Sequence, residues 1–362
     1  MKKEKGLSKM TINQAESKEK AEIMTNVDLS EENSLGVRSV ADRYTKIDNL
    51  SQIEWLYKKG ELREPDIFVL GGGSNVLFAE RVKRLLLKIE IKGIEITGET
   101  HSHVLIRAGA GENWHKLVSW CVKHDFGGIE NLALIPGTTG AAPVQNIGAY
   151  GVELEQVFHS LEAFDMKTGN LVTFEKKDCE FAYRDSVFKG RYKNRFIITR
   201  LNLKLTKRDH SVEYSYRSLQ ERLDAKKIRN PGIPDIYETV IEIRKSKLPD
   251  PSDIGNAGSF FKNPVISDRK FSELKREYQD IPSYQADENR VKIPAGWLIE
   301  KAGWKGRRIG NVGTYENQAL VIVNHGGAAA SEIYEYALNI LKSVKELFGI
   351  ELVPEVNLIG EF

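Results

Sequence analysis

The chain has 362 residues, of which 41% are hydrophobic and 29% are charged, close to the average for a globular protein. A chain of this length is expected to form two or three domains. Its 53 Lys and Arg residues nearly balance its 51 Asp and Glu residues, which leaves a net charge of +2. This balance gives no basis for binding nucleic acid or an anionic membrane, and we expect neither as a partner.

The N-terminus and the cysteines predict the cellular compartment. The first five residues, MKKEK, carry a net positive charge, but no apolar run follows them that could act as a signal segment. The longest apolar stretches, such as 319–323, are far shorter than the roughly 20 residues needed to cross a bilayer. Cys121 and Cys179 form no CxxC motif, and Cys121 falls on the apolar face of an expected helix. We therefore expect a cytoplasmic protein without disulfides. We also expect a monomer.

The first half of the chain begins with a polar segment. Residues 1–32 are rich in Lys, Glu, Ser, Asn and Gln and are predicted to be disordered, because they cannot bury enough apolar surface. Apolar spacing then predicts a helix over 50–59. Asn113 is a candidate N-cap for a helix that places Trp114, Leu117, Val118 and Cys121 on one face. Strands are predicted at 67–70, 76–78 and 104–108.

The second half predicts mixed α and β structure. Strand-like segments at 161–165 and 171–174 are joined by Thr168-Gly169-Asn170, which indicates a hairpin. Residues 196–205 alternate like a half-buried strand. A helix over 235–245 precedes the Leu-Pro-Asp-Pro sequence at 248–251, the clearest domain boundary in the chain. Beyond it we predict helices at 269–278, 295–302 and 331–348 and strands at 319–324 and 356–359.

Two glycine-rich segments, 71–75 and 136–151, are candidate ligand-binding loops. Neither matches the dinucleotide fingerprint GxGxxG, and no P-loop motif occurs. A tight strand connection explains the first segment equally well. The second is too poor in large side chains to build a core, but it allows the backbone to lie flat against a large ligand. A cofactor that carries a pyrophosphate is the natural candidate.

Metal chemistry finds little support in the sequence. The seven histidines are scattered, and no HExxH or Cys/His cluster occurs. His101 and His103 share one strand face but lack a third ligand nearby. We predict no metal site.

Three segments carry candidate catalytic side chains. Arg184 and Asp185 stand among aromatic residues, where the arginine could stabilise an anion or form a structural ion pair. Ser259 lies among small residues and two phenylalanines, where it could donate a proton or cap a turn. Glu355 lies at the start of a late strand and could equally be an ordinary strand-edge carboxylate.

At these segments the chain resembles the UDP-N-acetylenolpyruvoylglucosamine reductase family, type I, over 33–360. Nine motifs carry the resemblance in order: LGGGSNVLF (70–78), GAGENWHKLV (109–118), ENLALIPGTTGAAPVQNIGAYGVELEQV (130–157), YRDSVFK (183–189), SKLPDP (246–251), NAGSFFKNPV (256–265), VKIPAGWLIEKAGWKG (291–306), NQALVIVN (317–324) and PEVNLIG (354–360).

The resemblance implies an α+β fold. It consists of a two-subdomain FAD-binding unit of the vanillyl-alcohol-oxidase (PCMH) type and a C-terminal α+β substrate-binding domain. We expect a disordered extension at 1–32. FAD-binding subdomain 1 is then expected at 33–85, and residues 353–362 are expected to rejoin it. FAD-binding subdomain 2 is expected at 86–247 and the substrate-binding domain at 248–352.

The resemblance also implies an activity and residue roles. The activity is the NADPH-dependent, FAD-mediated reduction of UDP-N-acetylglucosamine enolpyruvate to UDP-N-acetylmuramate in peptidoglycan synthesis. Arg184 would stabilise the enolate-like intermediate, Ser259 would donate a proton and Glu355 would complete the catalytic site. Substrate would contact Tyr150, Tyr216, Lys247, Asn263 and Gln318. FAD would contact Gly71, Gly72, Gly73, Ser74, Asn75, Pro136, Gly137, Thr138, Gly140, Ala141, Gln145, Asn146 and Gly148.

The sequence departs from the family pattern at three places, none of them a matched catalytic residue. Leu35 stands where phenylalanine is usual, Val353 replaces a glutamate before PEV, and Thr314-Tyr315 replaces a Val-His pair. Two alternative functions remain at this stage. One is another FAD-dependent oxidoreductase or oxidase on the same scaffold, and the other is a non-catalytic UDP-sugar sensor.

Overall fold

Two units make up the chain in the computed structural model, which describes residues 19–63 and 67–362. The first unit contains the chain up to Val27, Ala41–Gly72 and Lys83–Arg244. The second unit contains Asp28–Val40, Gly73–Val82 and Lys245–Phe362. Each unit has its own cluster of buried apolar side chains.

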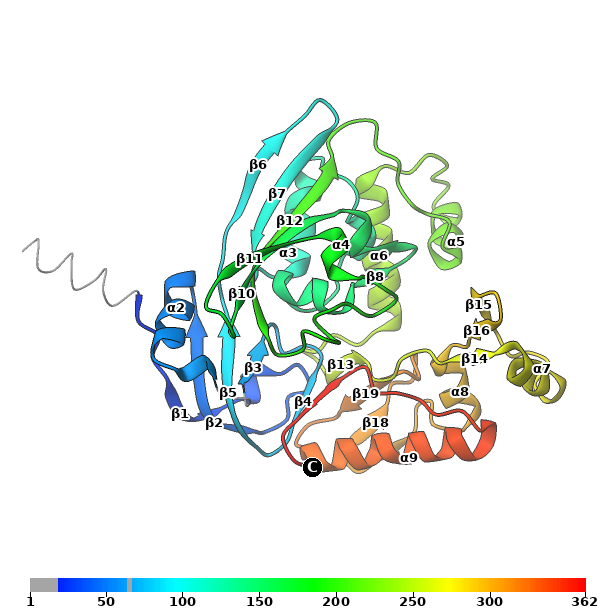
Figure 1. The fold of residues 1–362 in the computed structure, drawn as a ribbon. Helices are drawn as coiled ribbons and strands as arrows, with labels where there is room; N and C mark the ends of the chain where they lie inside the picture. The colour runs from blue at the N-terminus through cyan, green and yellow to red at the C-terminus, as the bar shows by residue number, and fades with distance from the viewer. Residues whose placement is uncertain (1–18, 64–66) are drawn as a thin grey trace, which may run out of the picture. The chain divides into compact units, whose positions relative to one another are not determined.

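Two sheets form the framework of the first unit (Figure 1). The larger is antiparallel, in the order β11 (Leu171–Glu175), β10 (Phe158–Asp165), β12 (Phe196–Thr206), β7 (His103–Gly109) and β6 (Ile94–Glu99). The smaller has the order β1 (Met24–Asp28), β2 (Val40–Ile47), β5 (Arg81–Ile89) and β3 (Ile67–Leu70). β3 and β5 are parallel, and β3 ends at Leu70, directly before the first glycine loop.

The helices of the first unit include α2 (Leu50–Lys58), α3 (Trp114–Lys123), α4 (Lys176–Cys179), α5 (Arg217–Ala225) and α6 (Ile233–Lys247). α3 begins where the sequence predicts, because the Asn113 side chain accepts a hydrogen bond from the Lys116 backbone N–H. Its apolar face is buried, and it packs on α6, where the Ser119 and Tyr237 hydroxyls lie 2.7 Å apart.

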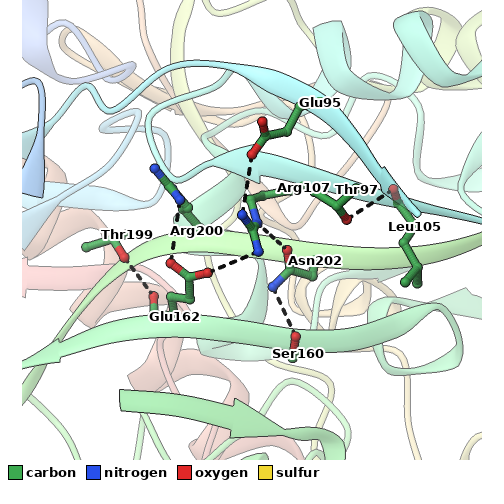
Figure 2. A network of polar contacts seen from close by, with 9 residues as sticks. All are labelled: Glu95, Thr97, Leu105, Arg107, Ser160, Glu162, Thr199, Arg200 and Asn202. Atoms are coloured by element: carbon green, nitrogen blue, oxygen red, sulfur yellow. Dashed lines mark hydrogen bonds and ion pairs between the residues drawn. The ribbon is translucent and has the colours of Figure 1, made fainter. Parts of the chain in front are cut away.

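A ladder of polar side chains crosses one face of the five-stranded sheet (Figure 2). Arg107 on β7 lies opposite Glu95 on β6 and Asn202 on β12. Its guanidinium nitrogens lie 3.5 Å from a carboxylate oxygen of Glu95 and 3.5 Å from one of Glu162 on β10. Its Nε donates to Asn202 Oδ1 at 3.2 Å. Because opposite charges on neighbouring strands attract, the ladder ties β6, β7, β12 and β10 together.

The second unit also contains several small sheets. One has the order β13 (Gly255–Ser259), β19 (Val321–Asn324), β18 (Val312–Thr314) and β17 (Arg308–Ile309). Another has the order β14 (Val265–Ser267), β16 (Arg290–Lys292) and β15 (Tyr284–Asp287). β20 (Asn357–Ile359) pairs in parallel with β4 (Val76–Phe78). Its helices include α7 (Asp268–Glu277), α8 (Ala295–Lys301) and α9 (Ala330–Phe348).

The start of ordered structure differs from the expectation. The strand β1 at Met24–Asp28 lies inside the segment 1–32 that we predicted to be disordered, and Ala21 is only 5% exposed. β1 is an edge strand hydrogen-bonded to β2, so its polar backbone is satisfied by sheet pairing and needs no core of its own. The expected extent of disorder is therefore corrected here, while residues 1–18 lie outside the described residues.

The predicted helices and strands are found within a few residues of their expected ends, and the predicted hairpin is formed by β10 and β11. Several strands were not predicted, among them β2, β5, β6 and β13. β13 has the sequence GNAGS, whose glycines and alanine have little tendency to form strands. It forms because it pairs with β19, a contact that local propensity does not reveal.

Candidate active site

Within the first unit, Gly71 and Gly72 of the first glycine-rich loop lie in direct contact with the second loop. A Cβ atom on Gly71 would lie 2.6 Å from Thr138 Oγ1, and one on Gly72 would lie 2.9 Å from Gly137 Cα. Real Cβ atoms are essentially never found at such distances, so an alanine at position 71 would have to displace the Thr138 side chain, and position 72 accepts only glycine unless the backbone moves. The loop that ends β3 and the loop at 136–141 therefore form one surface.

This surface fits a cofactor that brings its own hydrogen-bonding groups. The Thr138 hydroxyl is buried, and it has no hydrogen-bond partner among the described residues. A buried hydroxyl without a partner costs free energy, which a bound ligand would recover. Small residues beside it, including Gly71, Gly72 and Gly137, allow close approach. The residues present thus fit the predicted FAD.

The rest of the second loop is fixed by the protein itself. A 3₁₀ helix runs over Thr139–Gln145, and the Gly140 and Ala141 backbone N–H groups donate to Ala110 and Thr138. Asn146 is fully buried with φ 44°, and its side chain binds Glu153, the Ala182 carbonyl and the Glu155 N–H. That side chain orders the loop, so any contact of Asn146 with FAD is left to its backbone.

Arg184 is positioned by this ordered loop. It has φ 55°, and its Nη2 donates to the Gly148 carbonyl at 2.7 Å. The turn that carries it is anchored by Ser186, whose hydroxyl donates to the Val144 carbonyl at 2.7 Å. Lys189 Nζ lies 3.4 Å from Gln145 Oε1 and 3.4 Å from the Arg184 carbonyl. The predicted catalytic arginine is thus fixed on the predicted cofactor loop.

Tyr150 and Tyr216, two predicted substrate contacts, lie against each other. Their rings pack edge to face, with centroids 5.4 Å apart and planes at 81°. Burial raises the pKa of the Tyr150 phenol, while the nearby Arg244 guanidinium opposes that rise and Tyr216 adds to it. The Tyr150 carbonyl accepts a hydrogen bond from Asn131 Nδ2 at 2.9 Å. These two residues, 66 positions apart in the chain, are therefore in contact within the first unit.

Ser259 and Glu355 are brought together in the second unit. Ser259 ends β13, where it pairs with Val321 of β19. The next residue, Phe260, accepts a hydrogen bond at its carbonyl from the Glu355 N–H at 2.8 Å. The Glu355 carbonyl in turn accepts one from Asn75 Nδ2 at 3.2 Å. The backbone therefore places the predicted proton donor beside the predicted carboxylate.

Asn263 and Gln318 meet at the beginning of α8. Asn263 Oδ1 accepts a hydrogen bond from the Ala295 N–H at 2.9 Å. A Cβ atom on Gly296 would lie 3.1 Å from Gln318 Oε1, so this side chain also lies against the first turn. The third predicted substrate contact in the second unit is Lys247. It is the last residue of α6, and its side chain is exposed.

The sequence matches two known family profiles. The profile of an FAD binding domain matches residues 47–175. The profile of the C-terminal domain of UDP-N-acetylenolpyruvoylglucosamine reductase matches residues 250–359. A reductase of this name from Flavobacterium johnsoniae is 41% identical over 338 residues, which is 93% of this chain and 100% of that protein.

The chain belongs to the UDP-N-acetylenolpyruvoylglucosamine reductase family.

Further relatives agree with this membership, and a solved structure has a similar fold. Reductases from Amoebophilus asiaticus and Pseudomonas aeruginosa are 44% and 45% identical, over 93% and 81% of this chain and 99% and 86% of their own. The crystal structure of the reductase from Thermus caldophilus has 23% sequence identity and a TM-score of 0.64, covering 94% of this chain and 99% of that chain. The predicted fold, an FAD-binding unit followed by the C-terminal domain of this family, is confirmed.

The predicted catalytic residues of this reductase family are divided between the two units. Arg184 belongs to the first unit, and Ser259 and Glu355 belong to the second. Within the described residues, no group of three or more His, Cys, Asp or Glu could hold a metal ion. No described helix is long and apolar enough to span a membrane.

Sequence reasoning missed two polar residues beside the site, Asn131 and Arg244. Asn131 is 1% exposed and links the Tyr150 and Glu213 carbonyls. Arg244 Nε donates to the Leu134 carbonyl at 3.2 Å. Arg244 lies in a helical segment between Ile243 and Lys245, where an arginine has no distinctive local signal. Its neighbours are decided by tertiary contacts.

Proposed function

We propose that this chain catalyses the NADPH-dependent, FAD-mediated reduction of UDP-N-acetylglucosamine enolpyruvate to UDP-N-acetylmuramate, in peptidoglycan precursor synthesis. The observation that carries the proposal is the 41% identity to a reductase of this name over that protein's full length. The local geometry around Arg184 and around Ser259 and Glu355 supports it.

FAD, when bound, supplies the redox chemistry by accepting hydride from NADPH and delivering it to the enolpyruvyl group. The remaining work falls to side chains of this chain. Hydride addition leaves negative charge on the adjacent carbon and its carboxylate. The Arg184 guanidinium, fixed at 2.7 Å from the Gly148 carbonyl, is a preorganised cation for that charge. Such fixed groups stabilise a transition state without reorganising during the reaction.

Ser259 then donates a proton to the substrate carbon. A serine hydroxyl is a weak acid, so this role requires a strongly basic acceptor, which a carbanion provides. Glu355 completes the same site. The hydrogen bond between the Glu355 N–H and the Phe260 carbonyl supports this placement, because it fixes Glu355 next to the end of β13.

The UDP-sugar is held by the remaining predicted contacts. Tyr150 and Tyr216 present two ring surfaces from the first unit, and they would cover the substrate. Lys247, Asn263 and Gln318 would bind the sugar nucleotide, chiefly its diphosphate. A lysine and two amides are suitable side chains for a diphosphate, which carries negative charge and accepts several hydrogen bonds.

The proposal places the enzyme in the cytoplasm as a monomer. Both cysteines are free and buried, as expected of a protein in a reducing compartment. The preference for NADPH over NADH is likewise part of the proposal.

The test is anaerobic stopped-flow absorbance of the bound flavin. The protein is reduced with NADPH and mixed with either UDP-N-acetylglucosamine enolpyruvate or UDP-N-acetylglucosamine. We expect rapid reoxidation only with the enolpyruvyl compound. A flavin that stays reduced with this compound but reoxidises quickly in oxygen would identify an oxidase instead.

The variant Ser259→Ala tests the proton donor. It should leave reduction by NADPH unchanged and slow reoxidation by the enolpyruvyl compound by about 10²–10⁴-fold, the usual contribution of a general acid. Ser343→Ala, at a half-buried position of α9 outside the predicted site, is the matched control and should behave as the wild type. Equal rates in all three proteins would remove Ser259 from the mechanism.

A further inference from the structure

Arg244 is fixed to the segment that leads into the second glycine loop. It lies near the end of α6, and its Nε donates to the Leu134 carbonyl at 3.2 Å. Leu134 has φ 57°, and its N–H donates to His115 Nδ1 at 3.0 Å. Leu134 is therefore held on both sides. Because the Nε atom is occupied, the two Nη groups of Arg244 are the ones left for another partner.

The same segment connects Arg244 with Tyr150 and Arg184, all within the first unit. Asn131, three residues before Leu134, donates to the Tyr150 carbonyl at 2.9 Å. Gly148, two residues before Tyr150, accepts from Arg184 at 2.7 Å. These hydrogen bonds place the three side chains in one neighbourhood of the predicted active site.

This neighbourhood contains two guanidinium groups, those of Arg184 and Arg244, and also the Glu153 side chain, which lies beside Gly148 and accepts a hydrogen bond from Asn146 Nδ2. Burial lowers the pKa of the Arg244 guanidinium, the Tyr150 phenol opposes that shift, and the positive charge of Arg184 lowers it further. Among the residues that the structure describes, no carboxylate pairs with Arg244. Arginine stays charged in proteins, so folding desolvates this cation without a counter-charge from the described chain. A ligand that brings a negative charge would offset that cost.

We propose that Arg244 is an anion-binding residue, which together with Arg184 and Tyr150 receives a negative charge that arrives from outside the chain during the reaction. This inference rests on the proposed function. The anion has two available sources, the carboxylate of the enolpyruvyl substrate and the negative charge that FAD acquires on reduction. Both require a cation that is in place beforehand, and a guanidinium fixed through Nε meets that requirement.

The experiment compares the FAD-bound wild type with Arg244→Gln and Arg244→Lys. Lys245→Gln is the matched control, because it removes one positive charge from the next residue of α6, whose side chain is exposed. The first measurement is the equilibrium constant for two-electron reduction of the bound flavin, from a redox titration. The second is the dissociation constant of UDP-N-acetylglucosamine enolpyruvate and of UDP-N-acetylglucosamine, from the flavin absorbance change.

If the charge on FAD is the anion, Arg244→Gln should lower the reduction equilibrium constant at least tenfold, about 30 mV for a two-electron couple. If the substrate carboxylate is the anion, the variant should weaken binding of the enolpyruvyl compound at least tenfold and leave UDP-N-acetylglucosamine binding unchanged. Arg244→Lys should recover most of either effect, because it keeps the charge. Lys245→Gln should match the wild type.

The proposal is overturned if both constants of Arg244→Gln stay within twofold of the wild type. It is also overturned if the Lys and Gln variants are equally impaired, since the hydrogen bond to Leu134 would then be the only role of Arg244. Should the Gln variant not retain FAD, the Lys variant carries the test: both constants within twofold of the wild type would support the role of the charge, and either constant changed at least tenfold would overturn the proposal. Failure of the proposed function would be seen separately, as wild-type protein whose reduced flavin is not reoxidised by the enolpyruvyl compound.

Discussion

For single residues, steric contacts determine which side chains the glycine loops can contain. Gly72 faces backbone, the Gly137 Cα atom, whereas the atom nearest to Gly71 is the end of the Thr138 side chain, which can rotate away. A methyl group at position 72 therefore has to move the second loop as a whole. That loop carries the residues predicted to hold FAD, so a steric clash at position 72 should reduce the affinity for FAD.

We predict that Gly72→Ala weakens FAD binding more than it weakens the fold. The added Cβ would lie 2.9 Å from Gly137 Cα, and relieving such contacts typically costs about 1–3 kcal/mol. FAD retention after gel filtration and the dissociation constant of FAD measure the effect. Gly232→Ala is the control, because its Cβ would meet nothing closer than 3.7 Å. Wild-type FAD affinity in Gly72→Ala would contradict the placement of FAD on these loops.

The two cysteines give a second prediction at the residue scale. Burial raises the pKa of Cys121 and of Cys179 to about 12, from 9.0 for an ordinary thiol. The folded protein therefore keeps these protons between pH 9 and pH 12, while the unfolded chain loses them. Stability should consequently fall as pH rises above 9, by up to about 1.4 kcal/mol per pH unit for each thiol.

Denaturant unfolding of the wild type and of Cys121→Ala between pH 8 and pH 11 measures this slope. We expect a shallower decline in the variant, because one of the two thiols no longer titrates. Parallel slopes would show that Cys121 does not contribute. At pH 7.5, both thiols should resist a maleimide reagent until the chain is unfolded.

At the scale of elements, polar side chains hold strands together where apolar contacts are absent. Glu162 on β10 lies near two guanidinium groups, those of Arg107 and Arg200, at 3.5 Å and 3.8 Å. Asn202 extends the ladder by donating to Ser160 Oγ at 3.0 Å. Since the side chains of Arg107 and Glu162 are 33% and 18% exposed, salt screens their attraction only in part.

We predict that Arg107→Gln lowers the free energy of unfolding by about 1 kcal/mol, because several cross-strand contacts are lost at once. The difference from wild type should shrink in 1 M salt. Lys204→Gln, an exposed position on β12, is the matched control for loss of one positive charge and should have little effect. Urea unfolding at low and high salt measures both. No difference between the two variants would show that the ladder does not stabilise the sheet.

At the scale of the whole molecule, sequence-distant segments complete each unit. The segment 353–359 returns to Asn75, where the Asn357 side chain donates to the Asn75 carbonyl at 3.0 Å across 282 residues of chain. The same segment fixes Glu355. In the first unit, the buried Thr138 hydroxyl remains without a partner among the described residues, which is a cost that bound FAD would remove.

FAD should therefore stabilise the folded chain. Adding FAD to the apo-protein at about 100 times its dissociation constant should raise the free energy of unfolding by about 2.7 kcal/mol, since only the folded state binds it. Thermal unfolding against FAD concentration measures the effect, with FMN, which lacks the adenylate, as the control ligand. A melting temperature independent of FAD concentration would contradict an FAD site in this fold.

The local helices and strands and the family could be predicted from the linear chain. Asn113 and the apolar positions of α3 predicted that helix because capping and helical spacing act within a few residues. The nine ordered motifs named the fold, which the family matches confirm. These features are short-range patterns, and they are visible in a linear chain.

The contacts between residues far apart in the sequence could not be predicted without the folded structure. The contact of Tyr150 with Tyr216, the pairing of the GNAGS strand with β19, and the position of Arg244 near Arg184 depend on how the chain closes on itself. Local secondary-structure propensity does not predict these long-range contacts, because each of the residues involved is compatible with many other environments. For the same reason, the strand β1 was not predicted from its polar sequence, because it depends on pairing with β2.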